Sequence, residues 1–308
     1  MFHPSISRIT ATTALLVASV LPSLPEQAFA QTARPAKVVV GDVELHYIEQ
    51  GQGEPVILLH GGQGDYRAWQ SLMEALVPRH RVISYSRRYH WPNANPLTAA
   101  NHSALIDADD LAGLIAALRL GAVHLVGTSY GAFTALALAI KHPELVRSMV
   151  LAEPPVHSWV TGTARGATLY RERVATVHEP ARRAFAAGND EAAMRLFIDT
   201  FDGPGTFDGL PAERRTSILQ NARFFKAITS SSDPFPNLPK DAIRGLRMPV
   251  LIVRGADTDE LHRMVTEELG RLLPKADRLT VPRAGHGSPR QNPRVFNAAV
   301  LEFLDCRK

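Results

Sequence analysis

Apolar and polar positions alternate along the chain with two periods, one typical of strands and one typical of helices. Short runs rich in apolar and β-branched residues recur at positions 37–40, 43–48, 56–59, 81–86, 123–126, 146–152, 249–255 and 277–281. Longer segments with helical spacing of apolar residues lie between most of them, for example at 101–118 and 260–273. This alternation predicts an α/β fold, with a mostly parallel sheet of about eight strands flanked by helices on both faces.

The first three runs differ in how polar residues interrupt them. Residues 37–40 and 43–48 alternate in polarity around Gly41-Asp42, which predicts an antiparallel hairpin. Residues 56–59 are apolar throughout, which is typical of a strand buried on both faces of a sheet. We therefore expect a hairpin followed by a strand that is buried on both faces.

The segment 156–244 interrupts the alternation of strands and helices. Its helical patterns are broken by Gly203-Pro204-Gly205 and by the Pro-rich stretch at 233–236, and it contains no strand pattern. This pattern predicts a helical lid that is inserted after the sixth strand. The chain then divides into a core at 31–155 and 245–308 and a lid at 156–244.

The first thirty residues have the pattern of a secretory signal peptide. Arg8 precedes an apolar run at 11–21, and Ala28-Phe29-Ala30 supplies small residues before a cleavage site after Ala30. A membrane anchor is the alternative, but the apolar run is much shorter than the ~20 residues that a membrane span needs. We expect a periplasmic or secreted protein with no stable membrane insertion after cleavage.

Composition and charge exclude several classes of protein. The chain has 308 residues, of which 45% are hydrophobic and 21% charged, as in ordinary globular domains. Its net charge is +4 and its basic residues are scattered, which does not indicate nucleic-acid binding. Cys306 is the only cysteine, so no internal disulfide can form. The histidines show no metal-ligand spacing, so we expect no metal and no cofactor, and no feature indicates an oligomeric state.

One pentapeptide carries the clearest chemical signal. Gly127-Thr128-Ser129-Tyr130-Gly131 has the pattern G-x-S-x-G, and it follows an apolar strand and precedes an Ala- and Leu-rich helical run. This pattern places a serine on a strained corner between a strand and a helix, with its hydroxyl exposed. The flanking glycines are needed because the corner leaves no room for a Cβ atom.

Further polar residues follow other predicted strands. Ligands of α/β sheets gather at the carboxyl ends of the strands, so residues at these ends are the candidates for chemistry. A serine nucleophile needs a base, and the base needs a carboxylate that fixes its tautomer. The candidates in chain order are His60-Gly61-Gly62, Ser129, Glu153, the pair Asp257 and Asp259, and His286.

These motifs together resemble the α/β-hydrolase superfamily along nearly all of the chain that follows the signal peptide. The glycine turn, the elbow at 127–131, the helical insertion and Gly285-His286-Gly287 match it. The resemblance implies that Ser129 is the nucleophile and His286 the general base. It also implies that the backbone N–H groups of Gly62 and Tyr130 form the oxyanion hole.

The acid of the triad departs from the commonest pattern of this superfamily. Relatives often have an aspartate at the third position after the glycine that ends the seventh strand, where this chain has Thr258. Haloalkane-dehalogenase-like members instead place the acid after the sixth strand, where Glu153 lies. We take Glu153 as the first choice, with Asp257 and then Asp259 as alternatives, and a structural carboxylate bonded to loop amides remains a further interpretation of Glu153.

Other residues near the strand ends have two interpretations. Arg87 and Arg88 either bind a substrate carboxylate or bridge loops structurally, and the second is our preference. His60 is expected to be structural. Aromatic residues of the insertion are expected to pack its core, with one or two lining a pocket: Trp159, Phe201, Phe224 and Phe225.

The sequence thus predicts a serine hydrolase that acts on a small-molecule ester or a related acyl bond. A cofactor-free perhydrolase and a carbon–carbon bond hydrolase would use the same triad. A serine at the elbow argues against haloalkane dehalogenase chemistry, in which a carboxylate forms the covalent ester. A non-catalytic ligand-binding protein of the same fold is the alternative from another class.

Overall fold

The structure is a computed structural model that describes residues 35–98 and 100–306. The signal peptide predicted at 1–30, with its cleavage site after Ala30, lies outside the described residues. Within the described ranges, no helix has the length and apolar character that crossing a membrane requires.

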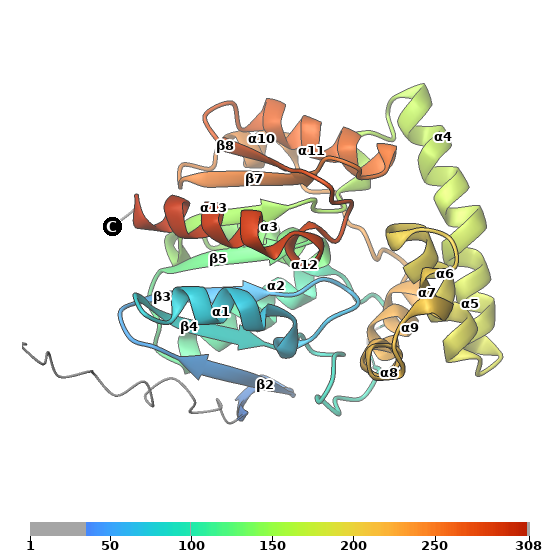
Figure 1. Ribbon diagram of the computed structural model, residues 1–308, viewed down its shortest axis with the longest axis horizontal. Coiled ribbons are helices and arrows are strands. Elements are labelled where there is room, and N and C mark those ends of the chain that lie inside the picture. The colour runs from blue at the N-terminus through green and yellow to red at the C-terminus, as the bar shows by residue number, and fades with distance from the viewer. Residues whose placement is uncertain (1–34, 99, 307–308) are drawn as a thin grey trace, which may run out of the picture. The chain divides into compact units, whose positions relative to one another are not determined.

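A single sheet of eight strands forms the centre of the described chain, in the order β1-β2-β4-β3-β5-β6-β7-β8 (Figure 1). Its strands are β1 (Ala36–Val40), β2 (Val43–Gln50), β3 (Glu54–Leu59), β4 (His80–Tyr85), β5 (Val123–Thr128), β6 (Val146–Ala152), β7 (Val250–Gly255) and β8 (Asp277–Val281). β2 pairs antiparallel with both β1 and β4, and all later pairs are parallel. The predicted sheet and the predicted hairpin are confirmed, and the hairpin lies at one edge of the sheet.

Helices cover both faces of the sheet, as the alternating pattern predicted. On one face, a 3-10 turn (Tyr66–Trp69) and the helices α1 (Gln70–Leu76) and α13 (Pro293–Asp305) pack against Val56 and Leu58 of β3. The other face carries α2 (Ala104–Ala117), α3 (Tyr130–Lys141) and α11 (Glu260–Leu272). Ile57 and Leu59 of β3 point into this second layer. The continuous apolar run of β3 is therefore explained by burial on both faces.

The described residues between β6 and β7 contain helices and no strand. They form 3-10 helix His157–Trp159, α4 (Ala164–Arg173), π-helix Val174–His178, α5 (Glu179–Ala186), α6 (Asp190–Asp202), α7 (Thr206–Gly209), α8 (Ala212–Gln220), α9 (Ala222–Ser230) and α10 (Lys240–Arg244). Figure 1 shows α4 to α9 gathered at one end of the sheet. A short helix, α12 (Ser288–Gln291), precedes α13 near the same end.

Candidate active site

Ser129 occupies the corner between β5 and α3. Its backbone has φ 51° and ψ −123°, a conformation that L-residues rarely adopt, and its N–H donates to the carbonyl oxygen of Ala152 at 2.7 Å. A Cβ atom on Gly131 would lie 2.2 Å from the carbonyl oxygen of Leu59, and one on Gly127 would lie 2.8 Å from the backbone of α3. The corner is strained and closely packed, as the G-x-S-x-G pattern predicted.

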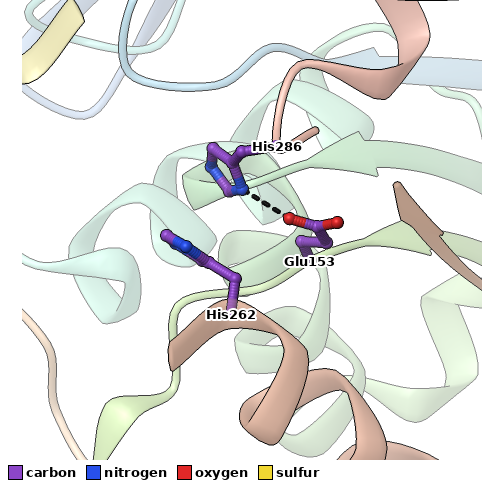
Figure 2. A group of neighbouring side chains, drawn as sticks. All are labelled: Glu153, His262 and His286. Atoms are coloured by element: carbon purple, nitrogen blue, oxygen red, sulfur yellow. Dashed lines mark hydrogen bonds and ion pairs between the residues drawn. The ribbon is translucent and has the colours of Figure 1, made fainter. Parts of the chain in front are cut away.

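Two hydrogen bonds connect Ser129 to His286 and His286 to Glu153. The distance from Ser129 Oγ to His286 Nε2 is 2.9 Å, and the distance from His286 Nδ1 to Glu153 Oε2 is 2.7 Å. Figure 2 shows the imidazole of His286 facing the carboxylate of Glu153. Because an ionised carboxylate only accepts, the Nδ1–H of His286 donates to Glu153. Its Nε2 is then the acceptor for the hydroxyl of Ser129, which is the tautomer that a general base needs.

Glu153 is buried and fully engaged by hydrogen bonds. Its Oε1 accepts from the N–H of Gly255 at 2.8 Å, and its Oε2 also accepts from the hydroxyl of Thr258 at 2.7 Å. Burial disfavours the charged form, but the hydrogen bond and charge of His286, with lesser help from other neighbours, outweigh it and hold the pKa of Glu153 below its usual range. The carboxylate therefore stays ionised at neutral pH.

The two alternative acids lie in other surroundings. Asp259 caps α11, because its Oδ1 accepts from the N–H groups of Leu261 at 3.0 Å and of His262 at 3.2 Å. Its Oδ2 accepts from Nδ1 of His262, and Arg173 forms an ion pair with it at 3.2 Å. Asp257 is exposed. Of the three candidate acids, Glu153 is the one whose carboxylate bonds to His286.

His262 is a neighbour of His286 that the sequence did not single out. The centroids of the two rings lie 3.9 Å apart with an interplanar angle of 31°. His262 is buried, and burial followed by repulsion from His286 lowers its pKa. It lies on α11, three residues after Asp259, and no motif marks it in the sequence.

Glu153, His262 and His286 together have the composition of a metal site, and their ligand atoms lie within 4.8 Å of one another. They come from separate parts of the chain, so linear spacing gave no indication of this group. Figure 2 shows that two of the three already bond to each other. A metal ion would have to compete with the bond between Glu153 and His286 for the same lone pairs.

A cavity of about 180 Å³ opens beside Ser129. Gly62 and Tyr130, whose backbone N–H groups are the predicted oxyanion donors, both line it. Within residues 35–98 and 100–306, neither N–H makes a loop, turn or side-chain hydrogen bond, so both are available to a ligand. The other lining side chains include aromatic rings, basic groups and one carboxylate, among them His157, Arg173, His178, Phe197, Phe201, Asp202, Arg214, Phe224, Phe225, Phe235 and Arg290.

Arg87 and Arg88 are not among the residues that line this cavity. Arg87 is fully buried and pairs with Asp107 at 2.5 Å, whereas Arg88 forms two hydrogen bonds with Asp110 at 2.6 and 2.7 Å. Both acidic partners are on α2. These contacts support the bridging interpretation and place neither guanidinium where it would meet a ligand beside Ser129.

His60 and the aromatic residues are placed largely as expected. The buried ring of His60 accepts the N–H of Arg87 at its Nε2 (3.1 Å) and donates to the carbonyl of Gly61, which makes it structural. The indole N–H of Trp159 donates to Leu238 at 2.7 Å, outside the cavity lining. Phe201, Phe224 and Phe225 do line the cavity, one more than the sequence suggested.

The family model described as the alpha/beta hydrolase family matches residues 56–299 of this chain. A 2-(acetamidomethylene)succinate hydrolase of Mesorhizobium japonicum is 29% identical over 281 residues, which cover 88% of this chain and 95% of the relative. A 2-hydroxy-6-oxononadienedioate/2-hydroxy-6-oxononatrienedioate hydrolase of Paraburkholderia xenovorans is 25% identical over 273 residues, which cover 86% of this chain and 91% of that relative. The solved enol-lactonase of Burkholderia xenovorans superposes with a TM-score of 0.73 at 18% identity, over 88% of this chain and 100% of that chain.

Proposed function

The chain belongs to the alpha/beta hydrolase family and is a hydrolase, and we propose that it cleaves a carboxylic ester or a related acyl bond through an acyl-enzyme on Ser129. The proposal rests mainly on the continuous hydrogen bonds from Ser129 to His286 and from His286 to Glu153. Ser129 lines a cavity together with Gly62 and Tyr130. Nucleophile, base and orienting acid are therefore within hydrogen-bond reach in one arrangement.

In the first half of the reaction, Ser129 Oγ attacks the acyl carbon while His286 Nε2 takes the hydroxyl proton. The imidazolium that forms is stabilised by the Glu153 carboxylate, which stays ionised. The N–H groups of Gly62 and Tyr130 donate to the oxyanion, and each such donor contributes ~3–4 kcal/mol in comparable enzymes. His286 then returns the proton to the leaving group.

In the second half, a water replaces the leaving group beside His286. His286 removes a proton from this water, which attacks the acyl carbon on Ser129 Oγ, and the same donors stabilise the second tetrahedral intermediate. Collapse of that intermediate returns the proton to Ser129 and releases the acid. No cofactor takes part in these steps.

Carbon–carbon bond hydrolysis is the second candidate, because the relative from Paraburkholderia xenovorans is named as a hydrolase of an oxononadienedioate. The two reactions would use the same serine, base and oxyanion donors. Turnover of a panel of p-nitrophenyl esters, set beside turnover of a 2-hydroxy-6-oxo-dienoate, separates them by their kcat/KM values.

Labelling with a fluorophosphonate probe tests the role of Ser129. We expect the probe to modify Ser129 in wild type, and we expect Ser129→Ala to lose both the label and the turnover of p-nitrophenyl esters. Circular dichroism of Ser129→Ala controls for folding. If Ser129 stays unmodified in folded wild-type protein, the proposal is contradicted, and a role as a ligand-binding protein of this fold is favoured.

We also propose that the protein acts in the periplasm or outside the cell. The support is the sequence pattern of Arg8, the apolar run at 11–21 and the cleavage site after Ala30. Mass spectrometry of the native N-terminus tests it, with Gln31 expected as the first residue. Retention of residues 1–30 in the cytoplasmic fraction would contradict it.

A further inference from the structure

We propose that the cavity beside Ser129 holds a subsite for an anionic group of the substrate, a carboxylate in the simplest case, and that Arg214 binds it. This inference rests on the proposed function in one respect, since it takes the cavity as the place where the substrate lies. It adds a substrate class, namely esters that carry a negative charge.

Arg214 is a cation of the cavity wall that forms no ion pair with the described part of the chain. It lies on α8 and lines the cavity, and within residues 35–98 and 100–306 its guanidinium forms no hydrogen bond and no ion pair. The two other arginines of the cavity are paired, Arg173 with Asp259 at 3.2 Å and Arg290 with Asp202 at 2.8 Å. Five N–H donors of a half-buried guanidinium are thus available to a ligand.

The charge of the lining also favours an anion. The residues that line the cavity include three arginines and one carboxylate, that of Asp202, so positive charges exceed negative ones in the lining. Burial and the nearby Arg290 lower the pKa of Arg214, so its charge is held in an unfavourable environment. A carboxylate with two oxygens would relieve this, because it matches the planar fork of a guanidinium.

Two arginines of the cavity lie close to His286, the general base of the proposed mechanism. Arg290 and Asp202 adjoin Gly287, the residue after His286: a Cβ atom on Gly287 would lie 3.1 Å from Arg290 Nη2 and 3.4 Å from Asp202 Oδ1. Arg214 interacts electrostatically with the same two side chains. The anionic end of a substrate would therefore bind on the wall that carries His286.

The remaining wall is apolar and suits the uncharged part of such a substrate. It consists largely of phenylalanine rings from the helical insertion: Phe197, Phe201, Phe224, Phe225 and Phe235. A cavity of ~150 Å³ holds a benzene ring, so about 180 Å³ fits a short chain or one ring. We infer a compact substrate with an apolar middle and one charged end.

Matched esters test the subsite. Mono-p-nitrophenyl adipate and p-nitrophenyl hexanoate have acyl chains of equal length, and 4-acetoxybenzoate and its methyl ester place the charge on the alcohol side instead. We expect Arg214→Met to lower kcat/KM for the charged ester of at least one pair ~10- to 100-fold, as loss of a charge-assisted hydrogen bond does. The neutral partner should change less than about twofold. Arg215→Met, the next residue on α8 and outside the cavity lining, is the matched control.

Calorimetry with adipate supplies a readout that needs no turnover. Wild type and Arg215→Met are expected to bind adipate, and Arg214→Met is expected to bind it at least tenfold more weakly. Equal losses for charged and neutral esters in Arg214→Met, or no adipate binding by wild type, would overturn the subsite. Failure of fluorophosphonate labelling at Ser129 would instead overturn the proposed function, so the two failures are distinguishable.

Discussion

Two histidine–carboxylate pairs lie side by side at the end of the sheet, and they differ in what else they contact. Glu153 bonds to His286 Nδ1, and His286 bonds through Nε2 to Ser129. Asp259 bonds to His262 Nδ1, and the ring of His262 packs against that of His286. In composition and in the bond between acid and imidazole the pairs are alike. Of the two pairs, the first reaches Ser129, the proposed nucleophile.

The two pairs are distinguished by the other contacts of their carboxylates. Glu153 is 1% exposed and directs one oxygen to the backbone and the other to His286 and Thr258, which fixes the direction of the bond to the base. The side chain of Asp259 is 30% exposed and is engaged in capping α11 and pairing with Arg173. The second pair holds a helix end in place beside the first.

The largest effect is expected from breaking the first pair. Glu153→Gln keeps the shape of the side chain but offers an amide where His286 needs an anion. By analogy with the serine-protease case, turnover should fall ~10⁴-fold because the imidazole loses its tautomer and its stabilised charge. The measurement is kcat on a p-nitrophenyl ester, with fluorophosphonate labelling as a second readout.

Asp259→Asn is the matched control for this substitution, since asparagine still caps a helix. We expect its turnover to stay within a few-fold of wild type. A loss in Asp259→Asn as large as that in Glu153→Gln would remove the distinction between the pairs.

A smaller effect is expected from removing the ring that packs on His286. His262→Ala leaves a space beside the base, and because small displacements of catalytic groups are costly, kcat should fall about tenfold. His262→Phe refills the space without a titratable group and should restore most of the activity. If both variants were as inactive as His286→Ala, His262 would have a chemical role of its own.

The smallest effect is expected in the free energy of unfolding and in how it changes at acid pH. Burial opposes ionisation of Asp259, but His262 and Arg173 outweigh it and hold its pKa far below the usual range. The folded chain then binds fewer protons than the unfolded chain near pH 4. This contribution is complete above the unfolded pKa of ~4 and is lost as the pH falls further.

Asp259→Asn should therefore cost about 1 kcal/mol of unfolding free energy at pH 7, the size of an ion pair, and the difference from wild type should shrink toward pH 3. Urea unfolding at a series of pH values measures it. A difference that grows as the pH falls would contradict the assigned direction of the shift.

The sequence predicts the strands, the corner at Ser129 and the helical character of the insertion because these depend on local patterns. It also brings Glu153 and His286 into consideration, since both follow predicted strands whose ends meet. His262 and Arg214 escape prediction because they lie on helices, and the direction of a helical side chain depends on how the helix packs. Arg87 illustrates the converse: it lies at a strand end, yet its side chain points to Asp107 of α2.

The carboxylate of Glu153 accepts hydrogen bonds from Gly255 and Thr258, which follow the helical insertion, while Glu153 itself precedes it. These bonds close the chain into a loop whose two ends meet at the acid. A different set of helices could be spliced into this loop without moving the acid from the base. We therefore expect that a graft of the insertion from another member of the fold changes the substrate preference while the bond from Glu153 to His286 is kept.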